Sequence, residues 1–75
     1  MPSAIELIVD GYVRLSNRPA LEDLQTHRER LVADLKSRQS QGGAFDYSKS
    51  ITQIEEEIAV IEAGLEKSRA DSSSA

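Results

Sequence analysis

The 75-residue sequence contains no cysteine and no tryptophan, and its aromatic residues are one phenylalanine and two tyrosines. The lack of cysteine excludes disulfides, thiolate nucleophiles and zinc sites built from cysteine. With so few aromatics, a core has to be filled mainly by aliphatic side chains. A chain of this length hides only about 60% of the surface that its unfolded form exposes, and oligomerisation is a common remedy. We therefore expect a homo-oligomer or part of a larger assembly.

The sequence also lacks an apolar run that could cross a bilayer and a basic patch for nucleic acid. Its N-terminal apolar stretch, residues 4–15, contains Glu6 and Asp10 and is shorter than the roughly 20 apolar residues of a membrane-spanning helix. Nine basic against thirteen acidic residues give a net charge of -4, which repels a phosphate backbone. We expect a cytoplasmic protein with a protein partner, and neither membrane nor nucleic-acid binding.

Groups that could carry catalysis or bind a metal are few. His27 is the only histidine, and Asp23 lies one helical turn before it, but two ligands are too few for a zinc site. The consecutive carboxylates 55–57 fan around a helix, whereas a catalytic pair has to converge. Gly42 and Gly43 lack the lysine and the preceding strand of a phosphate-binding loop. The sequence predicts no enzyme activity, no metal and no cofactor.

What the sequence does contain is helical periodicity, beginning at its N-terminal end. Ser3 and Glu6 have the spacing of a capping box, in which two side chains satisfy free backbone amides at a helix start, and we expect a first helix over about 4–16. Gly11 costs about 1 kcal/mol inside such a helix relative to alanine. It indicates either a close helix crossing or an imperfect helix end. The apolar residues expected on one face are Ile5, Ile8, Val9, Tyr12 and Val13.

A second helix is expected after a corner at Pro19. Proline disfavours helical geometry in the residue before it, yet suits the first turn of the helix that follows. Glycine adopts the left-handed conformation that closes helix C-termini, so Gly42 and Gly43 are expected to end this helix. Its expected extent is about 19–41, which makes it the longest of the chain.

The third helix has the clearest periodicity. Ser50 and Gln53 have the spacing of a second capping box, and isoleucine then recurs at intervals of three and four, which predicts a helix over about 50–67. The serine-rich run 68–75 is expected to be a disordered tail. The predicted fold is all-α, with an antiparallel helical hairpin and a shorter N-terminal helix in a single domain, residues 1–67.

One antiparallel register aligns the apolar positions of the hairpin when both helices are written as heptads. Arg28 lies on this seam, where a guanidinium has to reach water or meet a carboxylate. An ion pair that fixes the register is one explanation, with Glu57 and Glu62 as candidate partners, and binding of a partner protein by Arg28 is the other. The register pairs Arg38 with Ile51, Leu35 with Ile54, Leu31 with Ile58, Arg28 with Ile61, Leu24 with Leu65, and Leu21 with Ser68.

Three surfaces remain for a partner. The first helix has more apolar residues than one small neighbour needs. The third helix has a face of small residues, which either the first helix of the same chain or a second subunit or target helix covers. In the connection between the hairpin helices, an aromatic ring either folds over the end of the hairpin or anchors a partner. The candidate protein-binding residues are Leu7, Leu15, Phe45, Tyr47, Ala59, Val60, Ala63 and Gly64.

The segment from Leu21 to Leu65 resembles the small head-to-tail joining proteins of lambda-like phages, the gpW-like family. The resemblance consists of a leucine-bearing helix, the Gly42-Gly43 stop, an aromatic-containing connection, and a run from residue 50 to 52, Ser-Ile-Thr, leading into an isoleucine-rich helix. It implies a virion structural protein, assembled as a ring between portal and tail, with no catalytic residues and a location in the virion.

From the residues themselves, we expect a non-enzymatic structural or assembly protein that acts by helix-mediated protein–protein association. The alternative is a small regulatory adaptor or chaperone-like module that holds a target helix in a groove between its first and third helices. Both hypotheses need apolar helix surface outside the core of the chain.

Overall fold

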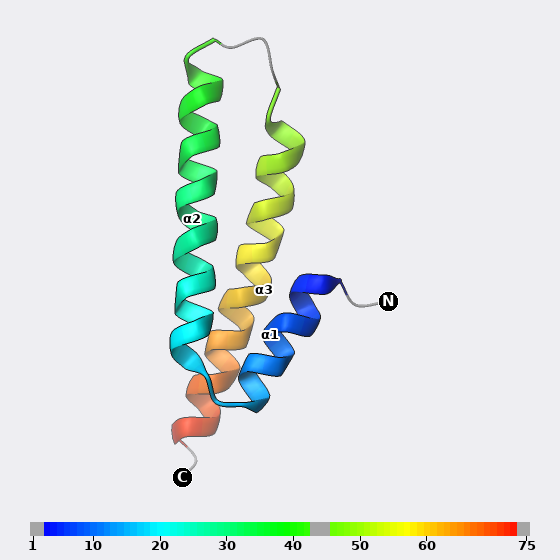
Figure 1. Ribbon diagram of the computed structural model, residues 1–75, viewed down its shortest axis with the longest axis vertical. Coiled ribbons are helices and arrows are strands. Elements are labelled where there is room, and N and C mark those ends of the chain that lie inside the picture. Colours follow the sequence, from blue (N-terminus) through cyan, green and yellow to red (C-terminus); the bar gives the residue numbers. More distant parts are fainter. Residues whose placement is uncertain (1–2, 43–45, 74–75) are drawn as a thin grey trace.

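The computed structural model describes residues 3–42 and 46–73, which form three helices and no strand. They are α1 (Ala4–Arg14), α2 (Arg18–Ser40) and α3 (Ser48–Ser73). Figure 1 shows α2 and α3 running antiparallel as a hairpin, with α1 beside the C-terminal half of α3 and pointing the same way along it. The all-α prediction of a hairpin with a shorter N-terminal helix is therefore confirmed.

The corner between α1 and α2 closes one helix and opens the next within three residues, 15–17. Ser16 has a φ of 55°, and its N–H donates to the carbonyl of Val13 at 3.1 Å, while the N–H of Asn17 donates to the carbonyl of Tyr12 at 2.9 Å. These two bonds form a Schellman motif. The side chain of Asn17 also accepts a 3.3 Å hydrogen bond from the N–H of Ala20 and thereby caps α2.

The left-handed backbone of Ser16 predicts that glycine is better there. An L side chain in this conformation costs roughly 1 kcal/mol, whereas glycine adopts it freely. We expect Ser16→Gly to raise the free energy of unfolding, measured by urea denaturation, by about 0.5–1 kcal/mol. The control Ser37→Gly, inside α2, is expected to lower it by about 0.5 kcal/mol. Destabilisation by both variants would contradict the strain at Ser16.

The remaining helix ends show where the sequence rules hold and where they fail. Ser3 caps α1 by accepting from the N–H of Glu6 at 3.4 Å, and Gly42, with a φ of 75°, follows the end of α2 as expected. The start of α3 differs, because it lies at Ser48 and is set by Asp46. The Asp46 carboxylate accepts hydrogen bonds from the Ser48 hydroxyl at 2.6 Å and from the Ser48 N–H at 2.9 Å. Both bonds lower the pKa of Asp46, and the bond from the hydroxyl has the larger effect.

The C-terminal end of α3 is also further along the chain than expected. The helix continues past residue 67 to Ser73, so residues 68–73 are helical where we expected disorder. The sequence register placed Ser68 in the layer of Leu21, and both residues are buried, with exposed fractions of 6% and 0%. A serine side chain is small enough to be buried between two helices. Amino-acid composition registers only that serine is polar, and therefore predicted an exposed tail. Residues 74–75 of the expected tail lie outside the described residues.

The core lies where all three helices meet, near the corner. Ile5 and Val9 of α1, Leu21 of α2 and Ile61 of α3 form one buried cluster, in which Leu21 and Ile61 have no exposed surface. Burying each of these large aliphatic side chains stabilises the fold by about 1.5–3 kcal/mol. The half-buried residues packed against the cluster are Tyr12, Val13, Leu24, Val60 and Leu65.

The seam of α2 departs from the expected heptad pattern near its middle. Leu31 is 38% exposed and Val32 only 8%, so the predicted layer of Leu31 and Ile58 is wrong and Val32 takes its place. A straight helix drifts by about 20° per heptad against a 3.5-residue repeat, and a four-residue step from Arg28 corrects that drift. On α3 the expected seam residues all face inward: Ile51, Ile61 and Ser68 are buried, and Ile54, Ile58 and Leu65 are half-buried.

The ion pair predicted for the seam is present. Arg28 Nε lies 3.1 Å from Glu57 Oε1, and both side chains are about three-quarters buried, with exposed fractions of 22% and 26%. Glu62, the other candidate partner, is exposed. A second cross-hairpin pair joins Lys36 Nζ to Glu55 Oε2 at 3.3 Å. The guanidinium of Arg28 is thus engaged within the chain, one turn of α3 before the layer of Ile61.

Candidate protein-binding surface

A groove between α1 and α3 brings together four of the candidate protein-binding residues: Leu7, Val60, Ala63 and Gly64. We call it the α1–α3 groove, and its volume is about 750 Å³. It is an open channel with an apolar floor and charged residues among its walls, which is the usual organisation of a protein interface. The other lining residues are Glu6, Val9, Asp10, Val13, Glu66 and Lys67.

Gly64 explains why α1 approaches α3 so closely. A Cβ added at Gly64 would collide with Cγ1 of Val9 and lie 3.4 Å from Cγ2 of Val13. Glycine removes that clash, so α1 of the same chain covers the small-residue face at this point, which settles the alternative at Gly64. Ala59 and Ala63 on the same helix remain exposed. The small-residue face is therefore divided between an intramolecular contact and open surface.

α1 has a second apolar surface, which faces solvent. Leu7, Ile8 and Leu15 are 60%, 45% and 74% exposed, the highest values among large apolar residues together with Leu31. Ile8 was expected on the buried face, and that prediction is wrong. At 3.6 residues per turn these three side chains and the small residues between them occupy an arc of roughly 100°. We call this surface the outer face of α1; it consists of Ala4, Leu7, Ile8, Gly11 and Leu15.

Charged residues of opposite sign run along one edge of the outer face. Arg14 Nε lies 3.1 Å from Asp10 Oδ2, and the two side chains are 79% and 49% exposed. Glu6 lies on the same side of α1 one turn earlier, in the wall of the α1–α3 groove. Exposed pairs of this kind add only about 0.3–0.5 kcal/mol to a helix. Their charges remain available to a partner that packs on the outer face.

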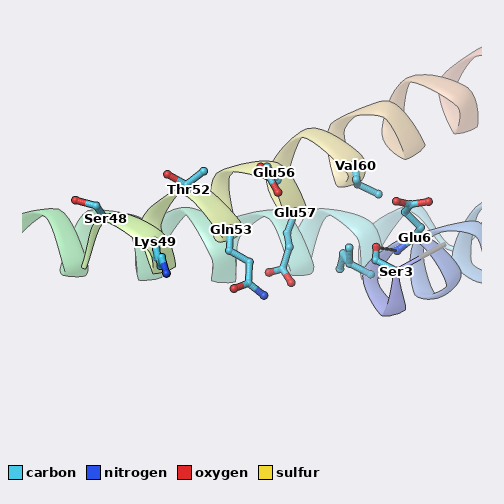
Figure 2. Close-up of a pocket in the computed structure, with 10 residues that line it drawn as sticks. Ser3, Glu6, Ser48, Lys49, Thr52, Gln53, Glu56, Glu57 and Val60 are labelled. Atoms are coloured by element: carbon cyan, nitrogen blue, oxygen red, sulfur yellow. Dashed lines mark hydrogen bonds between the residues drawn. The ribbon is translucent and has the colours of Figure 1, made fainter. Parts of the chain in front are cut away.

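A second hollow, of about 730 Å³, lies beyond the N-terminal end of α1. Figure 2 shows Lys49, Gln53 and Glu57 following one another along one side of this region on α3, with Ser3 and Glu6 at the start of α1 beyond Glu57. Most of its lining residues are of polar or charged types, and Ile5 and Val60 are its large apolar residues. Because Glu6 and Val60 line both hollows, this region continues the α1–α3 groove.

The connection between α2 and α3 contains the last two candidates. Tyr47 is half-buried, and its N–H donates to Gln39 Oε1 at 3.1 Å while its carbonyl accepts from the N–H of Ile51 at 2.9 Å. These bonds tie Tyr47 to both hairpin helices. Phe45 lies outside the described residues. The choice between a covering ring and an exposed anchor stays a prediction.

Within the described ranges, no three histidine or acidic residues are grouped so as to hold a metal ion. No helix of residues 3–42 and 46–73 has both the length and the apolar character that crossing a bilayer requires. His27 is exposed, with Nδ1 2.9 Å from Nη1 of Arg28.

Comparisons with family models, with curated proteins and with solved structures find no match to this chain. Functional inference therefore depends on the surface. Sequence reasoning found Leu7, Val60, Ala63 and Gly64 of the groove. It also found the charged edge, because the four-residue spacing of Glu6, Asp10 and Arg14 places them along one side of a helix, and the predicted pair of Asp10 and Arg14 is present. The outward position of Ile8 was missed.

Proposed function

We propose that this protein is a non-enzymatic assembly component that acts by helix-mediated association with another protein surface. The observation that supports the proposal is the exposure of Leu7 and Leu15, at 60% and 74%. The core around Leu21 and Ile61 is complete without them. An apolar helix face that the fold does not use marks a contact site in a small protein.

Association on the outer face of α1 has a clear energetic basis. Full burial of a leucine side chain is worth about 1.5–3 kcal/mol, and both leucines have most of that gain still available. The α1–α3 groove lies next to Leu7, so a partner helix on the outer face has apolar surface beside it. The charged edge formed by Asp10 and Arg14 restricts the orientation of the partner, because charge complementarity contributes mainly to specificity.

The test is the mass of the purified protein as a function of concentration, measured by light scattering. We expect the mean mass of the wild type to rise with concentration and that of Leu15→Asp to stay monomeric with unchanged helicity. Ser37→Asp, which adds the same charge to the exposed surface of α2, is expected to behave as the wild type. A wild type that stays monomeric throughout would contradict self-association.

The alternative is an adaptor or chaperone-like module, and the α1–α3 groove favours it. Its apolar floor and its volume of about 750 Å³ suit a row of side chains from an amphipathic helix. In this version the target occupies the groove, and the protein is monomeric until the target binds. A monomeric wild type in the scattering experiment is the result that favours the adaptor.

Within the assembly hypothesis, a joining role between phage head and tail is supported only by the resemblance of residues 21–65 to that family. A virion protein of this kind works as a ring of identical subunits, which requires surfaces that join copies of one chain. Portal and terminase genes beside the gene of this protein would support the virion role. A gene neighbourhood of regulatory or secretion proteins would support the adaptor.

A further inference from the structure

Within the part of the chain that the structure describes, two glycines lie inside helices, and only one is explained by the packing of the chain. Gly64 makes room for Val9. At Gly11, an added Cβ would meet nothing within 4 Å, and α1 continues through this position to Arg14. A helix end at Gly11 is therefore wrong, and a close helix crossing at Gly11 does not occur within the chain. Side-chain packing within the monomer therefore does not explain a glycine that costs about 1 kcal/mol in a helix.

Gly11 lies in the middle of the outer face of α1, which adds a second observation. Leu7 and Ile8 precede it by about one turn, Leu15 follows it by one turn, and all three are exposed. Glycine at the centre of an apolar helix face is the arrangement that allows two helix backbones to approach closely. The exposed leucines and isoleucine then pack on either side of the crossing point.

We propose that two copies of the chain pair through the outer faces of their α1 helices, antiparallel and crossing at Gly11. This inference rests on the proposed function and specifies the partner surface as α1 of a second copy. The contact is isologous, so that each residue contact occurs twice. With Gly11 opposite Gly11, Ile8 of each copy faces Leu15 of the other.

The charges of α1 favour the antiparallel orientation. In an antiparallel pair with two-fold symmetry, each edge of a helix meets the same edge of its partner. The edge with Asp10 and Arg14 therefore lies beside the same edge of the second copy, with the chain running in the opposite direction. This places Arg14 of one chain near Asp10 of the other. In a parallel pair this edge would instead meet the opposite edge, beside Tyr12, and the charges would have no counterpart. The antiparallel pair thus gains an electrostatic attraction between Arg14 and Asp10 at two symmetric places, and this attraction favours the antiparallel orientation.

The size of the face limits the strength of the pair. A helix of 11 residues is about 16 Å long at a rise of 1.5 Å per residue. Stable complexes bury about 800 Å² on each partner, and one face of so short a helix offers less. We expect a reversible dimer with a dissociation constant in the micromolar range or weaker, detectable only when concentration is varied.

The first test changes the crossing point and leaves the apolar residues in place. Gly11→Gln introduces a good helix former where the monomer has open space, so we expect helicity and thermal stability to be kept or raised. Dimerisation, measured by sedimentation equilibrium, is expected to weaken at least tenfold. Ser37→Gln on the exposed surface of α2 is the matched control and is expected to dimerise as the wild type does.

The second test reports the orientation. The chain has no cysteine of its own, so single thiols can be placed with Ile8→Cys and with Leu15→Cys. When the two variants are mixed and oxidised, we expect the mixed disulfide to form in excess of the share that random pairing gives. Excess of the disulfide between two Leu15→Cys chains would indicate a parallel pair and overturn the proposal.

The possible failures can be told apart. If the wild type self-associates and Gly11→Gln does so equally well, the pairing at Gly11 is overturned, while the proposed association function stands on another surface. If the wild type is monomeric at every concentration, the pairing and the self-associating form of the proposed function are both overturned. Loss of helicity in Gly11→Gln would contradict the open space at Gly11, and the disulfide experiment then decides the pairing.

Discussion

Replacement of Ile61 by alanine is expected to lower the free energy of unfolding by about 2–5 kcal/mol. Ile61 has no exposed surface and belongs to the one cluster to which all three helices contribute. Alanine removes apolar contacts and leaves a cavity, because helices held on several sides relax only partly. Proteins of this size have a total stability of roughly 4–11 kcal/mol, so the variant is expected to lose a large share of its stability.

Urea denaturation followed by helicity measures this effect, and two controls calibrate it. Ile61→Val removes a single methyl group and is expected to cost about 0.5–1.5 kcal/mol. Ile8→Ala removes the same atoms as Ile61→Ala from a side chain that is 45% exposed, and should cost less than about 1 kcal/mol. If Ile61→Ala cost no more than Ile8→Ala, the core would have to lie elsewhere.

The same substitution at the two helical glycines is expected to have opposite effects. Gly11→Ala in dilute, monomeric protein should raise the free energy of unfolding by about 1 kcal/mol, the difference in helix propensity. Gly64→Ala gains the same propensity but forces its Cβ into Val9, whose branched side chain is held near one rotamer in a helix. Overpacking of this kind costs about 1–3 kcal/mol, and α1 is expected to be displaced.

Hydrogen exchange resolves which part of the molecule responds. In Gly64→Ala we expect the amides of α1 to lose protection first, while the hairpin, held by Arg28 and Glu57 across its seam, keeps most of its protection. Gly11→Ala is expected to leave protection in α1 unchanged or higher. Equal stabilisation by both alanines would mean that α1 does not pack on α3 at Gly64.

Much of the fold was predictable from local sequence signals. Apolar periodicity gave the three helices, and short capping rules gave the ends at Ser3 and Gly42, because these depend on residues a few positions apart. The hairpin pairing was predictable in outline, and it identified Glu57 as a partner for Arg28. The heptad assumption failed at Leu31 because it imposes a supercoil, whereas four-residue steps keep the stripe of a straight helix facing its neighbour.

The errors at the ends of α3 arose from competing local interactions. Asp46 accepts two hydrogen bonds from Ser48 and so starts the helix before the expected capping box at Ser50. Aspartate and serine both form such side-chain bonds, and the spacing alone does not say which one prevails. At the other end, the heptad register placed Ser68 on the seam opposite Leu21, where it is buried, whereas the serine-rich composition predicted a tail; the composition was the misleading signal.

The candidate site was predictable as a set of residues but not as a shape. Val60, Ala63 and Gly64 were recognisable as a small-residue face, and Leu7 as an excess apolar residue. Whether α1 or a partner covers that face depends on the angle between α1 and α2 at the corner that joins them. The left-handed backbone of Ser16 sets this direction, and glycine-like conformations at serine leave no clear mark in a sequence.

The packing of α1 mainly on α3, and less on the helix that follows it, has a consequence for the order of folding. Val9 and Gly64, which are in contact, are separated in sequence by α2 and most of α3. Closing so long a loop is slow and entropically unfavourable compared with forming the hairpin. α1 is therefore expected to dock last and to open first in the native state. For the proposed association between copies, we expect a second and slower route in which a released α1 packs in the same position on the hairpin of a neighbouring copy.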